Sequence, residues 1–157
     1  LEALEAGGAV LFRDKDLPRD ERLPLARRLR VQTAQLGIPL IVHGSEKLAR
    51  QVGAEGVHLP ASVAPAPLDG LWVGCSCHDR AEIERAESAG IDYITLSPVL
   101  ESPDKGKALG WECFELWARA SCLPVFALGG LSPNSLDRAR EHGAWGVAGI
   151  RGFLSSG

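Results

Sequence analysis

The sequence has no methionine, begins at Leu1 and contains only one tyrosine in its 157 residues. No apolar run reaches the roughly 18–20 residues that a membrane-spanning helix needs, and the first residues lack the charged-then-apolar pattern of a secretory leader. The formal net charge of −3 provides no excess of basic residues to displace counterions from a nucleic acid. We therefore expect a soluble, cytoplasmic protein whose partners include neither nucleic acid nor a membrane.

The four cysteines, Cys75, Cys77, Cys113 and Cys122, are not spaced as C-x-x-C, the pattern of zinc and redox sites. We expect them to be reduced, buried thiols, and we assign no metal ligand.

One unit recurs along the chain: a helical pattern, a glycine that ends it, and a short apolar run typical of a buried parallel strand. No shift in composition divides the sequence, so we predict a single domain over residues 1–157. The expected strands are 9–12, 38–42, 56–59, 71–75, 91–96, 124–128 and 146–150.

Helix signals lie between these runs. Asp79 and Glu82 form a capping-box pattern, and Ser132 followed by Pro133 predicts a helix start. Four residues at helical spacing share one face: Ala26, Leu29, Thr33 and Leu36. Strict alternation of strand and helix predicts an α/β fold with a parallel sheet, either open and doubly wound or closed as a (β/α)8 TIM-type barrel.

Polar residues follow nearly every expected strand, whereas an open sheet gathers its ligand groups at one switch point. This spread favours the barrel. A complete barrel usually takes about 250 residues, so we expect its first strand to be absent from this chain. The polar residues are Arg13, Lys15, His43, His58, Ser76, His78, Ser97, Gly129, Gly130 and Arg151, and Lys105 lies in the loop after Ser97.

Glycines follow the last two strands, as Gly129 and Gly130 and then as Gly149 and Gly152 around Arg151. Barrel enzymes commonly bind phosphate at these two loops, although tight turns also use paired glycines. Three cations, Arg13, Lys15 and Lys105, favour an anionic ligand over a purely solvated surface. His43 and His58 are either satisfied neutral histidines or ligand contacts.

From about residue 7 to residue 152 the chain resembles the family of thiamine phosphate synthase and its paralogue TenI, a thiazole tautomerase. The resemblance rests on segments 12–17 (FRDKDL), 52–59 (VGAEGVHL), 74–78 (GCSCH), 97–99 (SPV) with Lys105, 109–111 (LGW) and 124–130 (PVFALGG). It implies a small phosphorylated heterocycle as ligand, and it leaves open a homo-oligomer.

The family synthase joins a hydroxymethylpyrimidine diphosphate to a thiazole phosphate as the diphosphate departs. By resemblance, Arg13, Lys15, Ser76 and Lys105 match its diphosphate-binding positions. Gly129, Gly130 and residues 149–152 match the cradle of the thiazole phosphate. His43, His58 and Ser97 complete the candidate binding residues.

Three positions depart from the synthase pattern. Gly44 and Val63 stand where the synthase carries acids that hold Mg²⁺, and Leu11 replaces a glutamine. Mg²⁺ prefers carboxylate oxygens, so we expect this cation only if the chain is a true synthase, and no other cofactor.

A TenI-like tautomerase needs no metal, because it moves protons on a thiazole phosphate, and His78 matches its catalytic histidine. We name His78 and Lys105 as candidate catalytic residues and favour tautomerase-like proton transfer at His78. Thiamine phosphate synthase is the alternative enzyme. A third alternative is a ligand-binding module without catalysis, because segments 74–78, 96–100 and 109–111 resemble the TenI-like module fused to some bacterial Nudix hydrolases.

Overall fold

The computed structural model describes residues 7–14, 16–102 and 106–149. Strands and helices alternate along the described chain, except that β3 leads to β4 through a loop. The elements are β1 (Val10–Phe12), α1 (Arg19–Gln35), β2 (Leu40–His43), α2 (Glu46–Val52), β3 (Gly56–Leu59), β4 (Trp72–Cys77), α3 (Arg80–Ala89), β5 (Tyr93–Leu96), α4 (Gly110–Ala120), β6 (Val125–Leu128), the 3-10 helix η1 (Pro133–Ser135), α5 (Leu136–Glu141) and β7 (Gly146–Ala148).

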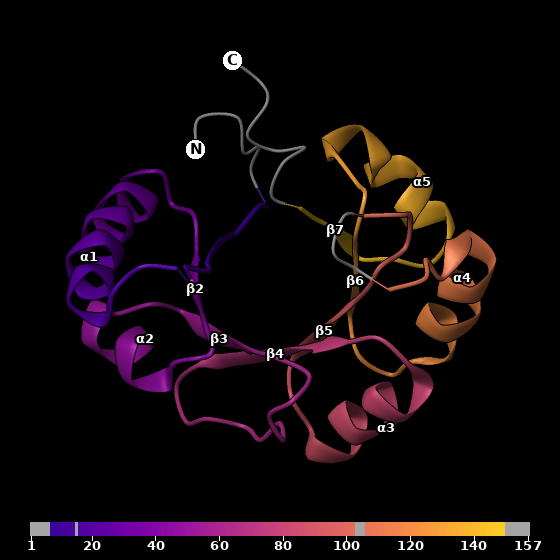
Figure 1. Cartoon of the computed structure of the whole chain (residues 1–157), viewed down its shortest axis with the longest axis horizontal. Coiled ribbons are helices and arrows are strands. Elements are labelled where there is room, and N and C mark those ends of the chain that lie inside the picture. Colours follow the sequence, from indigo (N-terminus) through magenta and orange to yellow (C-terminus); the bar gives the residue numbers. More distant parts are fainter. Residues whose placement is uncertain (1–6, 15, 103–105, 150–157) are drawn as a thin grey trace.

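The seven strands are all parallel and lie in the order β1-β2-β3-β4-β5-β6-β7. The sheet curves into a half-barrel with the helices on its outer side, and β1 and β7 are its two outermost strands among the described residues (Figure 1). The predicted TIM-type barrel is therefore confirmed in part. The parallel α/β architecture is present, but the described residues form seven strands and no closed barrel of eight.

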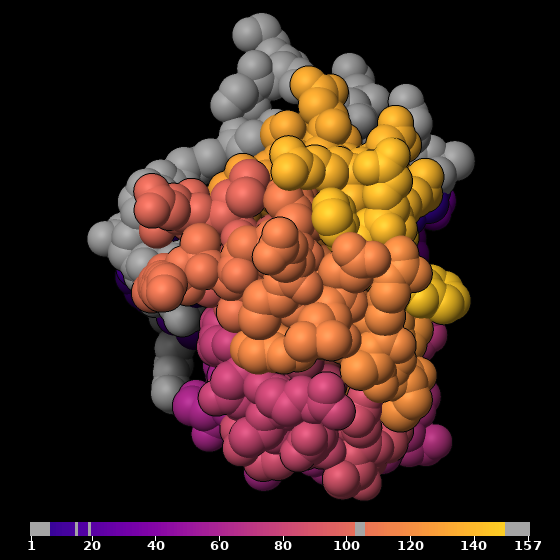
Figure 2. Space-filling view, turned by 90° about the vertical axis from the view of Figure 1, so that its right-hand side faces the viewer, coloured from indigo at the N-terminus to yellow at the C-terminus, as the bar shows by residue number. Residues whose placement is uncertain are grey.

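The hydrophobic core lies between the sheet and the helices. Alternate strand residues, such as Val42, Val57 and Val73, are fully buried there. The larger cluster of the core includes Phe114 of α4 and Ala139 of α5. The outer surfaces of these two helices form much of the orange and yellow face in Figure 2. The buried strand residues point outward toward the helices. The strand residues that alternate with them therefore point into the half-barrel.

Three strands have carboxyl ends that differ from the prediction. β2 continues by one residue, to His43. β4 continues to Cys77, because Ser76 and Cys77 pair in register with Thr95 and Leu96 of β5. The last strand ends at Ala148, and Gly149 follows it outside the sheet.

The helix signals are largely confirmed. The Asp79 side chain accepts a hydrogen bond from the Glu82 N–H and caps α3. Ala26 and Thr33 are fully buried on the inner face of α1, but Leu36 is 48% exposed because it follows the last turn of that helix. Ser132 begins the 3-10 helix η1 before α5.

The four cysteines are free, as predicted. Cys75 and Cys77 are also buried as predicted, but Cys113 is only half-buried and Cys122 is exposed in the loop before β6. Trp145, a large aromatic residue that would be expected to pack between helices and sheet, is 69% exposed just before β7. Among the described helices, none is long and apolar enough to cross a membrane.

Candidate functional site

The inner face of the half-barrel carries a layer of polar side chains near the carboxyl ends of its strands. His43 of β2 pairs in register with His58 of β3, and Ser76 of β4 pairs with Thr95 of β5. Strand alternation directs all four away from the hydrophobic core. The sequence predicted His43, His58 and Ser76 as site residues, and the structure brings them together.

His58 is the centre of this layer. Its Nε2 atom lies 3.0 Å from Ser76 Oγ and 3.4 Å from Thr95 Oγ1, and its Nδ1 atom lies 3.1 Å from Tyr93 Oη. The His43 ring lies beside it, with the two ring centroids 6.1 Å apart. Neighbouring strands β4 and β5 therefore contribute three hydroxyl groups to one buried imidazole.

Burial keeps His58 uncharged. Desolvation, with smaller repulsion from His43 and Arg13, lowers the pKa of His58 to about 4. A neutral imidazole has one N–H donor and one bare nitrogen acceptor, so its two ring nitrogens must play different roles toward Tyr93 and Ser76.

Two aromatic residues, Tyr93 of β5 and Phe126 of β6, lie on the same inner face, and glycines on neighbouring strands make room for their rings. A Cβ atom at Gly74 would overlap the Tyr93 ring, and one at Gly146 would lie 3.1 Å from the Phe126 ring. Tyr93 and Phe126 meet edge to face, with ring centroids 5.6 Å apart. Gly74 pairs in register with both His58 and Tyr93, and its lack of a side chain leaves room for the Tyr93 ring to reach across to His58.

His78 lies beyond the end of β4, and its side chain is exposed. Its Nδ1 atom is 2.8 Å from the Ser97 carbonyl oxygen, and its backbone N–H donates to the Glu82 carboxylate at 2.7 Å. A carbonyl can only accept, so Nδ1 of His78 carries the proton and Nε2 is the basic nitrogen of the neutral ring. Ser97 itself is fully buried and supports His78 through its backbone.

Gly129 and Gly130 follow β6 at the same end of the sheet. Loop residues after β5 extend the pairing, since the Val99 and Leu100 N–H groups donate to the carbonyls of Leu128 and Gly129. A Cβ at Gly129 would lie 2.7 Å from Pro98 Cα, so the close approach of this loop requires a glycine there. Gly149 follows the adjacent strand β7. The phosphate-binding role of these glycines stays a prediction.

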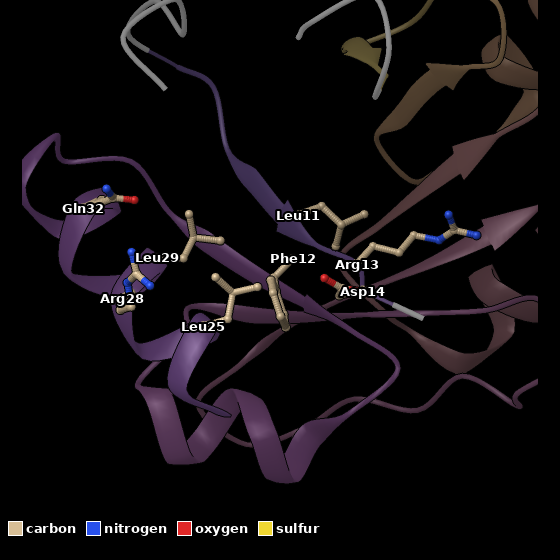
Figure 3. Close-up of a pocket in the computed structure, with 8 residues that line it drawn as sticks. All are labelled: Leu11, Phe12, Arg13, Asp14, Leu25, Arg28, Leu29 and Gln32. Carbon is tan, nitrogen blue, oxygen red and sulfur yellow. The ribbon is translucent and has the colours of Figure 1, made fainter. Parts of the chain in front are cut away.

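Arg13 follows β1 and lines a cavity of about 460 Å³ between that strand and α1 (Figure 3). Its side chain extends away from α1, whereas Leu25 and Leu29 of that helix line the opposite wall. Its positive charge reaches the polar layer, since it contributes to the lowered pKa of His58. The predicted site residues Lys15, Lys105, Arg151 and Gly152 lie outside the described residues.

The described residues do not fit Mg²⁺ as the family synthase holds it. The loops after β2 and β3 present Gly44 and Val63 rather than acids, and the adjacent side chains are imidazoles and hydroxyls. Both His58 nitrogens already face hydroxyl groups. Within residues 7–14, 16–102 and 106–149, no group of three or more His, Cys, Asp or Glu side chains could hold a metal ion.

Sequence reasoning missed Tyr93 and Thr95, which contact His58. The signal was present, because Tyr93, Thr95 and Ser97 alternate along β5 and its end and so share the inner face.

A parallel α/β half-barrel with its helices outside is a TIM-like fold, and the polar side chains of this chain lie near the carboxyl ends of the strands, where TIM-barrel enzymes have their active sites. The family described as thiamine monophosphate synthase matches residues 1–153, and the chain belongs to it.

Individual relatives agree with this assignment. The chain is 37% identical to a putative thiamine-phosphate synthase of Geobacter sulfurreducens, over 99% of this chain and 78% of the relative. It is 32% identical to putative thiamine-phosphate synthase 2 of Aquifex aeolicus, over 92% of this chain and 82% of the relative. A solved thiamine phosphate pyrophosphorylase from Pyrococcus furiosus has the same fold, with a TM-score of 0.80 and 24% identity over 93% of this chain and 75% of that chain.

Proposed function

We propose that the chain acts as a thiamine-phosphate synthase, joining hydroxymethylpyrimidine diphosphate to a thiazole phosphate. The observation that carries the proposal is its 37% identity, over nearly the whole chain, to a relative named for that activity. The polar layer inside the half-barrel supports it, because Ser76 and Arg13 offer a hydroxyl and a cation near the carboxyl ends of strands to an anionic substrate.

In this proposal the leaving diphosphate gains negative charge as its bond to the pyrimidine methylene breaks, and the thiazole nitrogen then attacks that carbon. Since Gly44 and Val63 carry no carboxylate for a cation, the protein's own positive groups must stabilise this charge. Arg13, Lys15 and Lys105 are assigned to the diphosphate, and Gly129, Gly130 and Gly149 to the thiazole phosphate.

The test is formation of thiamine phosphate from the two substrates, with added Mg²⁺ and with a chelator, beside a synthase of known activity. Product above background in either condition supports the proposal. Absence of product in both, while the reference synthase is active, contradicts it.

A second function, thiazole phosphate tautomerisation, is favoured by the hydrogen bond between His78 Nδ1 and the Ser97 carbonyl. That bond leaves Nε2 of His78 as a positioned general base. We expect His78→Ala to abolish tautomerisation while the Kd of the thiazole phosphate stays nearly unchanged. An unchanged rate in this variant would exclude His78 as the base.

The remaining alternative is a ligand-binding module without catalysis, such as one fused to a Nudix hydrolase, and it is tested by the Tm of the protein with phosphate esters. A raised Tm without any turnover would favour the module. An unchanged Tm with every phosphate ester would argue against the phosphate site.

A further inference from the structure

Tyr93 is the only tyrosine of the chain, and its hydroxyl points at His58 rather than at solvent. The proposed function assigns Tyr93 neither to the diphosphate nor to the thiazole phosphate. Its ring packs over Gly74 and against Phe126, and this packing places the hydroxyl 3.1 Å from His58 Nδ1. A side chain held this way can control which of the two His58 nitrogens carries the proton.

Burial raises the pKa of Tyr93 above its usual value, so the phenol keeps its proton throughout the physiological range. A phenol O–H is a good donor and its oxygen a weak acceptor, whereas the Ser76 and Thr95 hydroxyls on the other side of the ring accept well. The better pairing therefore has Tyr93 donating to Nδ1. The single imidazole proton is then on Nε2, from which it is donated to Ser76 Oγ, with Thr95 Oγ1 as a more distant second acceptor.

The tautomer of His58 decides whether the Ser76 hydroxyl can donate a hydrogen bond into the half-barrel. When His58 Nε2–H donates to Ser76 Oγ, the Ser76 hydroxyl proton is free to point into the half-barrel. In the opposite tautomer, bare Nε2 would accept that proton, and Ser76 would present only lone pairs to the interior. The first arrangement attracts an anionic group and the second repels it.

We propose that Tyr93 is a positioning residue: it holds His58 in the Nε2–H tautomer and thereby turns the Ser76 hydroxyl proton toward a bound phosphate or diphosphate. The part that concerns the anion rests on the proposed function. The part that concerns the tautomer is a property of the protein alone.

The tautomer is measured by long-range ¹H–¹⁵N NMR of the histidine ring nitrogens at neutral pH, with His58→Gln to assign the signals. We expect Nε2 of His58 to give the protonated, pyrrole-type shift and Nδ1 the bare, pyridine-type shift. In Tyr93→Phe we expect this preference to weaken or reverse. A protonated Nδ1 in the wild-type protein, or an unchanged tautomer in the variant, would overturn the proposal.

The consequence for Ser76 is measured by calorimetric titration with inorganic pyrophosphate and with thiazole phosphate. Tyr93→Phe should weaken binding of the anion about three- to tenfold, as expected for the loss of one oriented hydrogen bond. In a Ser76→Ala background the same substitution should have no further effect, because the hydroxyl it orients is gone.

Phe126→Leu is the matched control, since it disturbs the packing of the Tyr93 ring but keeps the hydroxyl. Equal loss of affinity in Phe126→Leu and Tyr93→Phe would assign the effect to packing and overturn the proposal. If the wild-type protein binds neither probe, the proposed function and the anion contact of Ser76 both fail, while the NMR measurement still decides the tautomer.

Discussion

At the scale of single residues, the site is built around a buried histidine that stays neutral. His58 is only 3% exposed, and its partners on β4 and β5 are hydroxyl groups rather than acids. No carboxylate among them can compensate a positive charge on the ring. This explains why burial dominates the shift of its pKa and gives the protein a defined sensitivity to acid.

Acid should destabilise the protein through His58. The pKa of this imidazole is about 4 in the folded protein, against an ordinary value of 6.5 once the chain unfolds, so the unfolded state binds more protons between these values. Stability is therefore full above pH 6.5 and falls as the pH drops toward 4, by about 2 kcal/mol at about pH 5.

The measurement is urea unfolding near neutral pH and at about pH 5 in the wild type and in His58→Gln. The variant should lose most of the difference between the two conditions. The same pH dependence in both proteins would show that other groups cause it.

The arrangement of the candidate site was only partly predictable. His58, Ser76 and His78 were predicted because each lies near or just past the carboxyl end of a strand, where parallel sheets place their ligand groups, and their roles in binding or catalysis stay predictions. Tyr93 was not predicted, because it is the first residue of β5 and lies at the opposite end of that strand from the carboxyl end. Its contact with His58 depends on a ring that reaches across Gly74 from β5 to β3, and this packing between strands is not visible in the sequence.

At the scale of elements, α4 shows most clearly how one helix divides between core and surface. Phe114 is fully buried against the sheet, while Leu116, two residues further along the same helix, is 67% exposed. Residues two apart lie on nearly opposite sides of a helix, so similar side chains have different energetic roles.

Phe114→Ala should therefore cost about 3–5 kcal/mol of unfolding free energy, because it leaves a cavity in the larger core cluster. Leu116→Ala should change stability by no more than about 0.5 kcal/mol. Chemical denaturation of both variants checks this, and a comparable loss in Leu116→Ala would mean that its exposed face is covered in solution.

Most elements were predictable, because a glycine followed by an apolar run marks where a helix gives way to a strand. Their ends were less predictable. Ser76 reads as a polar loop residue, but pairing with Thr95 keeps it within β4. The partner strand β5 is distant in the sequence, so a local sequence pattern around Ser76 cannot predict this pairing.

At the scale of the whole molecule, the described sheet has two free edges, at β1 and β7. The sequence correctly indicated parallel strands around a barrel-like interior, because polar residues followed nearly every strand. The sequence also predicted the TIM-type barrel with eight strands as its full form, and the described residues form seven parallel strands rather than a closed barrel of eight. Leu11 of β1 is 42% exposed at one of these edges.

Exposed apolar edge strands favour pairing between molecules. We expect the isolated 157-residue chain to associate through this edge in a concentration-dependent way, and Leu11→Lys to reduce that association by placing a charge there. Light scattering of both proteins at matched concentrations measures the effect. Leu116→Lys, a charge on the distant helix α4, is the control, and an equal reduction by this variant would contradict a role of the edge.

The unbroken strand order has a consequence for how the protein is made. Each strand from β2 to β7 pairs with the strand that precedes it in the chain, so its partner has already left the ribosome when it emerges. The sheet can grow by one strand with every unit synthesised, without waiting for a distant segment. Folding during translation should then follow the direction of synthesis, with each completed unit serving as the template for the next.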